Sequence, residues 1–353
     1  MKKWLKVALC ILLAVVLLVG GYVAYVFIDY HRLGDMTLTP THNADTAESG
    51  TVYTMISYNI GFGAYESDYG FFMDGGTESR AWSKERLTKN LTAISTFLQE
   101  QDADFYLLQE VDTGATRTYQ VDERTYFTEA LSGMSWVYCQ NYDSPYLMYP
   151  LLKPHGASHA GLMTFSTADI AAASRVELPI EGGFMKLLDL DRCYSVSRIP
   201  VSGSKELVLY NLHLSAYTSD GTIATEQLKL LLADMQAEYE SGNWCVAGGD
   251  FNKDLLGDSA AWFGEADQSY SWAQPIPAET FAGVDVSLAA PLDENDPVPS
   301  CRNADGPYHE GQYVLTVDGF LTTPNVTVSQ AIVLDTGFAW SDHNPVKMTF
   351  TLS

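Results

Sequence analysis

Positive charge is scarce in this 353-residue chain. There are 20 lysine and arginine residues against 44 aspartate and glutamate residues, and the formal net charge is −24. Three of the lysines stand at the N-terminus, so the rest of the chain has 17 basic residues against the same 44 acidic ones. Proteins that bind nucleic acid tightly present basic patches that neutralise phosphates. The charge balance therefore argues against tight, processive DNA binding, although a bound divalent cation can still provide positive charge for cleavage of a phosphate ester.

Short ligand-binding motifs are also missing. No C-x-x-C pair indicates a zinc site, and no G-x-G-x-x-G or G-K-S/T loop indicates a nucleotide-binding fold. Apart from Cys10, the cysteines are Cys139, Cys193, Cys245 and Cys301. Three of these four lie in strand-like apolar runs, so buried free thiols are at least as consistent with the sequence as disulfides. We expect no more than one disulfide.

One long apolar run is present. Residues 7–28 contain no charged side chain over 22 positions, which at a rise of about 1.5 Å per residue is long enough to cross a bilayer core. Three lysines precede the run and Asp29 follows it, so the positive-inside rule predicts a cytoplasmic tail (1–6), a transmembrane anchor (7–28) and an extracytoplasmic remainder. We therefore expect a single-pass plasma-membrane protein. A cleaved secretory signal is the alternative, but its apolar region is usually only about 7–15 residues long.

The remainder reads as a stalk followed by one domain. Residues 29–50 lack periodic apolar positions and predict a stalk, whereas residues 51–353 predict a folded domain. In this domain, strand-like runs such as TVYTMISYNI, ADFYLLQEVD, KELVLYNLHL, NWCVAGGDFN and VKMTF are interspersed with SKERLTKNLTAISTFLQEQ and TEQLKLLLADMQAEYE, which have helical periodicity. The pattern predicts a layered α/β fold.

Polar side chains stand at the ends of these apolar runs. A single such residue is usually a turn residue, but strand ends on one edge of a sheet can converge on one cleft. The residues concerned are Asn59, Glu110, His213, Asp250, Asn252, Asp318, Asp342 and His343.

The surrounding blocks carry a resemblance. SYNI, LLQEVD, NLHLS, GGDFN, TVDGF and SDHNPV, in this order, resemble the signature blocks of the endonuclease/exonuclease/phosphatase superfamily, over about Val52 to Leu352. The branch containing deoxyribonuclease I and the neutral sphingomyelinases is the most similar. The resemblance implies an α/β fold in the form of a four-layer α-β-β-α sandwich, here preceded by the transmembrane helix.

The same resemblance implies roles for the strand-end residues. Glu110 is similar to the main metal ligand, assisted by Asn59 and Asp342, and Mg²⁺ is the expected ion, with Mn²⁺ or Ca²⁺ as alternatives. Asp250 and Asn252 resemble the pair that positions or activates the attacking water.

The two histidines at strand ends complete the expected catalytic set. His343 resembles the imidazole that contacts the scissile phosphate, with Asp318 fixing its tautomer. His213 stands where abasic-site endonucleases typically have asparagine, so that activity is disfavoured.

The expected function is metal-dependent hydrolysis of phosphate esters by an extracytoplasmic phosphodiesterase or endonuclease. The substrate could be a nucleic acid, a phospholipid or a small phosphate ester; a lipid head-group or sugar-phosphate phosphatase is an alternative, and a non-catalytic binding ectodomain is another. His159 and Arg302 are candidate substrate-binding residues, although loop residues of this kind are more often solvated. The membrane is expected to be contacted through the N-terminal helix, and no obligate protein partner is evident.

Overall fold

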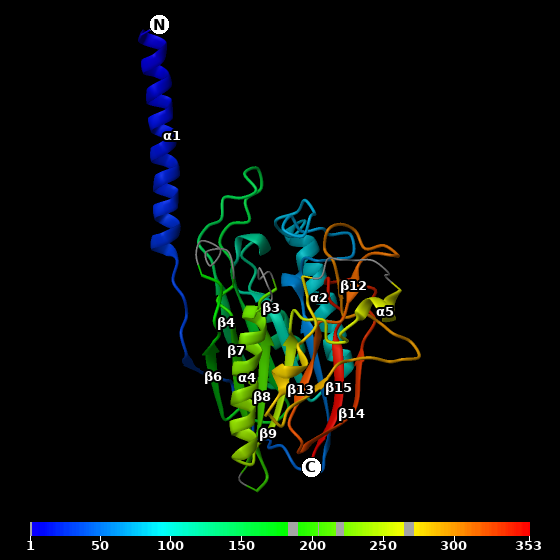
Figure 1. The fold of residues 1–353 in the computed structure, drawn as a ribbon. Coiled ribbons are helices and arrows are strands. Elements are labelled where there is room, and N and C mark those ends of the chain that lie inside the picture. Colours follow the sequence, from blue (N-terminus) through cyan, green and yellow to red (C-terminus); the bar gives the residue numbers. More distant parts are fainter. Residues whose placement is uncertain (1, 183–189, 204, 217–221, 265–271) are drawn as a thin grey trace.

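A long N-terminal helix stands apart from a layered body (Figure 1). The structure is a computed structural model that describes residues 2–182, 190–203, 205–216, 222–264 and 272–353. Helix α1 (Lys2–Asp29) extends away from the rest of the chain and is long and apolar enough to cross a membrane. A signal sequence near an N-terminus has the same properties, so the helix is consistent with either role.

The body is built on two mixed β-sheets. Among the described residues, one sheet has the strand order β1 (Met36–Leu38), β6 (Ala172–Glu177), β7 (Cys193–Val201), β8 (Lys205–His213), β9 (Trp244–Asp250), β13 (Asp318–Thr322) and β10 (Ser287–Ala289). The other has the order β14 (Val326–Val333), β15 (Val346–Leu352), β2 (Val52–Asn59), β3 (Phe105–Asp112), β5 (His159–Ser166) and β4 (Ser135–Asp143). A short pair, β11 (Cys301–Arg302) and β12 (Val314–Leu315), lies beside them.

The two sheets pack face to face. Met55 and Leu107 of the second sheet share one buried apolar cluster with Leu209 and Val246 of the first. Gly248 in β9 permits this approach, because a Cβ at that position would lie 2.8 Å from Cδ1 of Leu107. The α/β class and the two packed sheets are thus confirmed.

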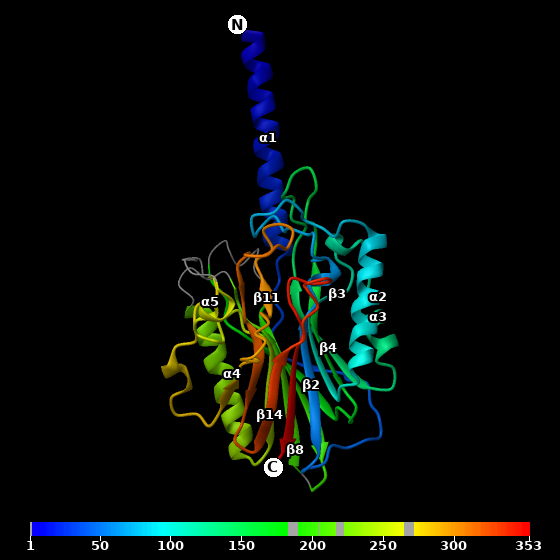
Figure 2. The same cartoon turned by 90° about the vertical axis from the view of Figure 1, so that its right-hand side faces the viewer.

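Helices cover the outer faces of the sheets (Figure 2). Helix α2 (Lys84–Gln101) begins where Ser83 Oγ accepts a hydrogen bond from the Arg86 amide, and it ends at Asp102 in a left-handed conformation. Its apolar stripe, including Leu91 and Ile94, is buried against the second sheet. Each such side chain contributes about 1.5–3 kcal/mol by leaving water.

The opposite face is covered by helix α4 (Thr222–Glu240), which buries Leu228 and Leu232 against the first sheet. The remaining helices are short: α3 (Arg124–Ala130), α5 (Ser259–Phe263), and the 3₁₀ turns η1 (Gly61–Gly63), η2 (Thr116–Thr118) and η4 (Ala278–Phe281). The layers therefore run helix, sheet, sheet, helix across the body (Figure 2).

The segment for which the sequence predicts a stalk contributes to the body. Residues 36–38 form β1, which pairs with β6 at the edge of the first sheet. Ala47 is buried and forms an isolated bridge with Val201. The folded part consequently begins before Thr51, because main-chain pairing at a sheet edge does not require a periodic apolar pattern.

The cysteines of the body are buried free thiols. The sulfur atoms of Cys139 in β4 and Cys193 in β7 lie 3.6 Å apart, across the two sheets. The limit of one disulfide stays a prediction, and this pair is the one in contact.

Candidate active site

The polar strand ends meet at one edge of the packed sheets. A cavity of about 180 Å³ opens there, and seven of the eight strand-end residues line it: Asn59, Glu110, His213, Asp250, Asn252, Asp342 and His343. Parallel pairing of β2 with β3 and of β8 with β9 puts the carboxyl ends of these four strands at the same edge. The eighth residue, Asp318, begins β13 and lies behind His343.

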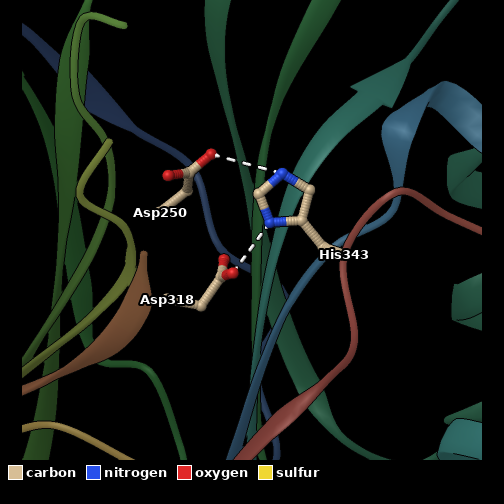
Figure 3. Close-up of side chains that lie close together, drawn as sticks. All are labelled: Asp250, Asp318 and His343. Atoms are coloured by element: carbon tan, nitrogen blue, oxygen red, sulfur yellow. Dashed lines mark hydrogen bonds and ion pairs between the residues drawn. The ribbon is translucent and has the colours of Figure 1, made fainter. Parts of the chain in front are cut away.

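His343 is held between two carboxylates (Figure 3). Its Nδ1 donates to Oδ2 of Asp318 at 2.7 Å, and its Nε2 lies 3.8 Å from Oδ2 of Asp250. Ser300 Oγ donates to the same Asp318 oxygen and so fixes the carboxylate. Burial opposes protonation of the ring, but Asp318 and Cys301 outweigh it and raise the pKa of His343 well above its ordinary value. The surroundings of the ring therefore favour its protonated form.

Asp250 is the centre of the polar network. Its Oδ2 accepts from Nδ2 of Asn59 at 3.1 Å and lies 3.5 Å from Nε2 of His213, while its Oδ1 accepts from the Asn252 amide at 2.9 Å. Burial raises the pKa of this carboxyl group to about 7, with His343 opposing the shift. A carboxyl group with such a pKa can exchange a proton near neutral pH.

The two imidazoles beside Asp250 have opposite pKa shifts. Burial, together with Arg192 and the charged His343, lowers the pKa of His213 well below its ordinary value. The surroundings therefore favour the neutral form of His213 and the protonated form of His343. Titratable groups whose environments drive their pKa values apart are the usual arrangement for acid and base roles.

Glu110 and Asn59 come from neighbouring strands. Asn59 Nδ2 lies 3.4 Å from Oε1 of Glu110, and its Oδ1 accepts from the Gly61 amide at 3.1 Å. Glu110 has a positive φ of 56°, at a register shift of β3 against β5 between Leu108 and Val111. Such bulges re-aim side chains and often occur beside active sites.

Comparison with known proteins identifies the family. A model of the endonuclease/exonuclease/phosphatase family matches residues 56–343. The chain belongs to this family. Among curated proteins, none matches the chain in sequence.

Solved structures agree in fold with this family assignment. The endonuclease/exonuclease/phosphatase of Beutenbergia cavernae DSM 12333 has a TM-score of 0.55 and 17% identity, over 86% of this chain and 72% of that one. ANGEL2, a 2′,3′-cyclic phosphatase crystallised with adenosine-2′,3′-vanadate, has a TM-score of 0.55 and 16% identity, over 90% and 99%. Truncated TDP2 of Caenorhabditis elegans has a TM-score of 0.51 and 15% identity, over 86% and 98%.

Two groups of residues in the site have donor atoms that fit a divalent cation. Asp250, Asp318 and His343 offer ligand atoms within 4.8 Å of one another. In the observed orientation, however, Nδ1 of His343 is already hydrogen-bonded to Asp318.

The carboxylates of Glu110 and Asp342 form the second group of donors. Burial raises the pKa of both, and Asp342 raises that of Glu110 further. Within the described part of the chain, neither carboxylate forms an ion pair. Glu110 and Asp342 are half-buried, line the cavity and offer the carboxylate oxygens that Mg²⁺ prefers.

The two candidate substrate residues lie in different places. His159 starts β5 and pairs with Asp143 at 3.1 Å; it is not among the residues that line the cavity. Arg302 does line the cavity and is only 1% exposed. Its guanidinium donates to main-chain carbonyl oxygens, namely those of Tyr65, Glu66, Tyr69, Asn303 and Gly306. Its evident role is therefore to hold two loops together.

Sequence reasoning missed two other arginines of the cavity. Arg117 is buried, forms a two-pronged ion pair with Asp112, and lies 3.8 Å from the ring centroid of Phe62. Arg192 donates to the main-chain oxygen of His213. Neither arginine belongs to one of the signature blocks. The scarcity of basic residues in this acidic chain was the one sequence feature that could have drawn attention to them.

Proposed function

We propose that the chain is a membrane-anchored, extracytoplasmic hydrolase of phosphate esters that depends on a divalent cation. The observation that carries this proposal is the position of Asp250, between a charged and a neutral imidazole and beside Glu110 and Asp342. Membership of the endonuclease/exonuclease/phosphatase family supports the reaction class.

Asp250 is proposed as the base that takes a proton from the attacking water. Its pKa of about 7 suits this role near neutral pH. The amide of Asn252 donates to the other oxygen of the same carboxylate, and Asn252 Nδ2 donates to the Leu214 carbonyl at 2.7 Å. The first hydrogen bond holds one oxygen of Asp250, and the second fixes Asn252 itself.

His343 is proposed to stabilise negative charge on the phosphate oxygens. It is held as an imidazolium by Asp318, and its Nε2 points toward Asp250. Neutral His213, on the other side of Asp250, is placed to donate to or accept from the same group. Preorganised donors aimed at developing charge are usually the largest single contribution to such catalysis.

Glu110, Asp342 and Asn59 are proposed to hold the cation, preferably Mg²⁺. A bound divalent cation supplies charge neutralisation at the phosphate and lowers the pKa of a bound water. The bulge at Glu110 directs its carboxylate toward the cavity that Asp342 also lines. Ser341 Oγ donates to the Asn59 carbonyl at 2.8 Å, which ties the loop of Asp342 to the end of β2.

The substrate is proposed to be a phosphodiester or another phosphate ester that contacts the protein through few phosphate groups. Arg117 and Arg192 bring positive charge to the cavity of a chain whose net charge is −24. A long polyanion would meet repulsion outside the cavity. Lipid head groups and sugar phosphates remain the alternatives, and a non-catalytic ectodomain is disfavoured because each expected residue of the site is present.

The location is proposed from helix α1. Lysines at the start of the helix and Asp29 at its end favour a cytoplasmic N-terminus and an external body. Intact-mass analysis of the protein from membranes would show whether the helix is retained, and cleavage of the body by protease added to intact cells would establish the side. Protection of the body would contradict this topology.

The activity test uses the full chain in lipid nanodiscs. Bis(p-nitrophenyl) phosphate should be hydrolysed with Mg²⁺ and not after chelation, and activity should return when Mg²⁺ is restored. Hydrolysis that persists in chelator would contradict the cation role. A panel of DNA, RNA, sphingomyelin, phosphatidylinositol phosphates and nucleotides would then rank the substrate classes.

A further inference from the structure

A loop with an uncharged outer part protrudes beside helix α1. It connects β4 with β5, and its outer part, residues 145–152, is called the lip below. Leu152 is fully exposed, Leu151 is 80% exposed and Tyr149 is 68% exposed. Figures 1 and 2 show the loop, in green, reaching beyond the rest of the body toward the side on which α1 extends. Exposed apolar side chains concentrated on one protruding segment mark an interaction surface.

The lip is hydrogen-bonded to the helix. Tyr22 Oη donates to the main-chain oxygen of Tyr146 and accepts from the amide of Met148, both at 3.1 Å. Tyr25 Oη accepts from the amide of Tyr146 at 3.0 Å. The lip is therefore fixed at the level of these two tyrosines along α1.

This level lies inside the apolar run of the helix. Tyr22 precedes Ile28, the last residue of the uncharged run, by six positions, which corresponds to about 9 Å along the axis. A bilayer that surrounds the run would thus also reach the lip. Tyrosine is enriched at the boundary between lipid and water, where its ring is buried and its hydroxyl remains hydrated.

The lip is connected to a residue of the cavity wall through the ring of Phe72. The ring of Tyr149 lies 5.6 Å from that of Phe72, and the ring of Phe72 lies 5.9 Å from that of His155. His155 lines the cavity, as do Phe71 and Met73 on the facing loop. An object that binds the lip therefore lies next to the mouth of the cavity.

We propose that the lip inserts into the boundary of the bilayer that α1 crosses and holds the mouth of the cavity against the lipid head groups. The inference rests on the proposal that α1 is retained as an anchor. The occupant is a lipid surface because the lip carries no charge and is joined to a helix of membrane-spanning length. Binding is apolar, so we expect it on zwitterionic phosphatidylcholine and expect little sensitivity to salt.

The test measures where the lip lies. Cys10, which is exposed on α1, is first replaced by serine. The Leu152→Cys variant of the full chain is then labelled with an environment-sensitive nitrobenzoxadiazole fluorophore. The labelled protein is held in phosphatidylcholine nanodiscs, with one copy per disc. The matched control is Leu230→Cys on α4, another exposed leucine. The other cysteines are buried and react slowly.

At position 152 we expect blue-shifted emission that is quenched by lipid-borne nitroxide and is protected from aqueous iodide. At position 230 we expect the reverse. If the fluorophore at position 152 emits as it does in water and is quenched only by iodide, the proposal is overturned. So would a blue shift that appears only when two copies share a disc, because the lip would then bind a second copy.

Hydrolysis of bis(p-nitrophenyl) phosphate, measured on the same samples, separates this proposal from the proposed chemistry. If hydrolysis fails while the label at position 152 reports lipid, the proposed reaction is contradicted and the proposed insertion of the lip is not. If hydrolysis proceeds while the label reports water, the proposed insertion of the lip is contradicted and the proposed reaction is not.

Discussion

The strand ends that line the cavity and the lip near its mouth are built differently. Asp250 and Asn59 stand at strand ends and are fixed by the pairing of the sheets and by a hydrogen bond between them. The lip, in contrast, leaves Leu151 and Leu152 in solvent. Buried polar groups that satisfy one another specify a single geometry, whereas exposed apolar side chains do not contribute to the stability of the fold. The strand ends are suited to chemistry, and the lip is suited to contact with a surface.

The largest effect should come from the strand ends. We expect His343→Ala to lower kcat about 10²-fold or more, because it removes the positioned imidazolium. The matched control is His309→Ala, an exposed histidine bonded to the Glu310 carbonyl, which should retain activity. Rates on bis(p-nitrophenyl) phosphate at saturating Mg²⁺ measure both variants. Full activity of His343→Ala would leave the histidine as a structural residue alone.

Glu110→Gln should act on cation affinity. Removal of one carboxylate charge from the cavity should raise the Mg²⁺ concentration for half-maximal activity by about 10- to 100-fold, the scale seen when a group that supports a metal is lost. Exposed Glu85→Gln on α2 is the control. Stabilisation of the protein by Mg²⁺ in thermal unfolding gives a readout independent of turnover, and unchanged stabilisation would count against the cation site.

His155, which lies between the cavity and the lip, should give a pH-dependent stability. Burial, with Arg117, lowers its pKa from 6.5 to about 3, and its ring hydrogen-bonds to the Ser79 carbonyl. The folded state keeps the ring neutral while the unfolded state takes up a proton, so stability falls as pH drops from 6.5 toward 3.

Between about pH 6.5 and pH 5 the contribution of His155 amounts to about 2 kcal/mol, from 1.4 kcal/mol per pH unit. Urea unfolding of the full chain in detergent at about pH 7 and about pH 5 should show a smaller loss for His155→Gln than for the unaltered chain. Equal losses would show that His155 titrates normally in the fold.

The smallest effect should come from the lip. Combined replacement of Leu151 and Leu152 by alanine should change the free energy of unfolding by less than about 0.5 kcal/mol, because these side chains have no packing to lose. The same change at buried Leu228 on α4 should cost about 2–5 kcal/mol. Denaturant unfolding of the full chain in detergent compares the two, and a large loss for the lip variant would mean that the lip packs against the body.

Periodicity predicted the regular elements because local rules decide them. The helix over Lys84–Gln101 follows from apolar spacing and from Ser83 as its cap, and the strands ending at Asn59, His213 and Asp250 follow from their apolar runs. The edge strand at residues 36–38 escaped detection, since its pairing with β6 depends on a segment more than 130 positions away.

Much of the candidate site was also visible in the sequence, because strand ends in signature blocks carry it. The sequence alone determined the residue types available: oxygen donors, two histidines, few cations and one long apolar helix. Only the tertiary structure decided that Arg117 enters the cavity, that Arg302 is committed to main-chain carbonyls, and that His159 lies elsewhere. It also decided that the pKa of His343 is raised and that of His213 lowered, because a pKa depends on burial and on neighbours brought together from distant strands.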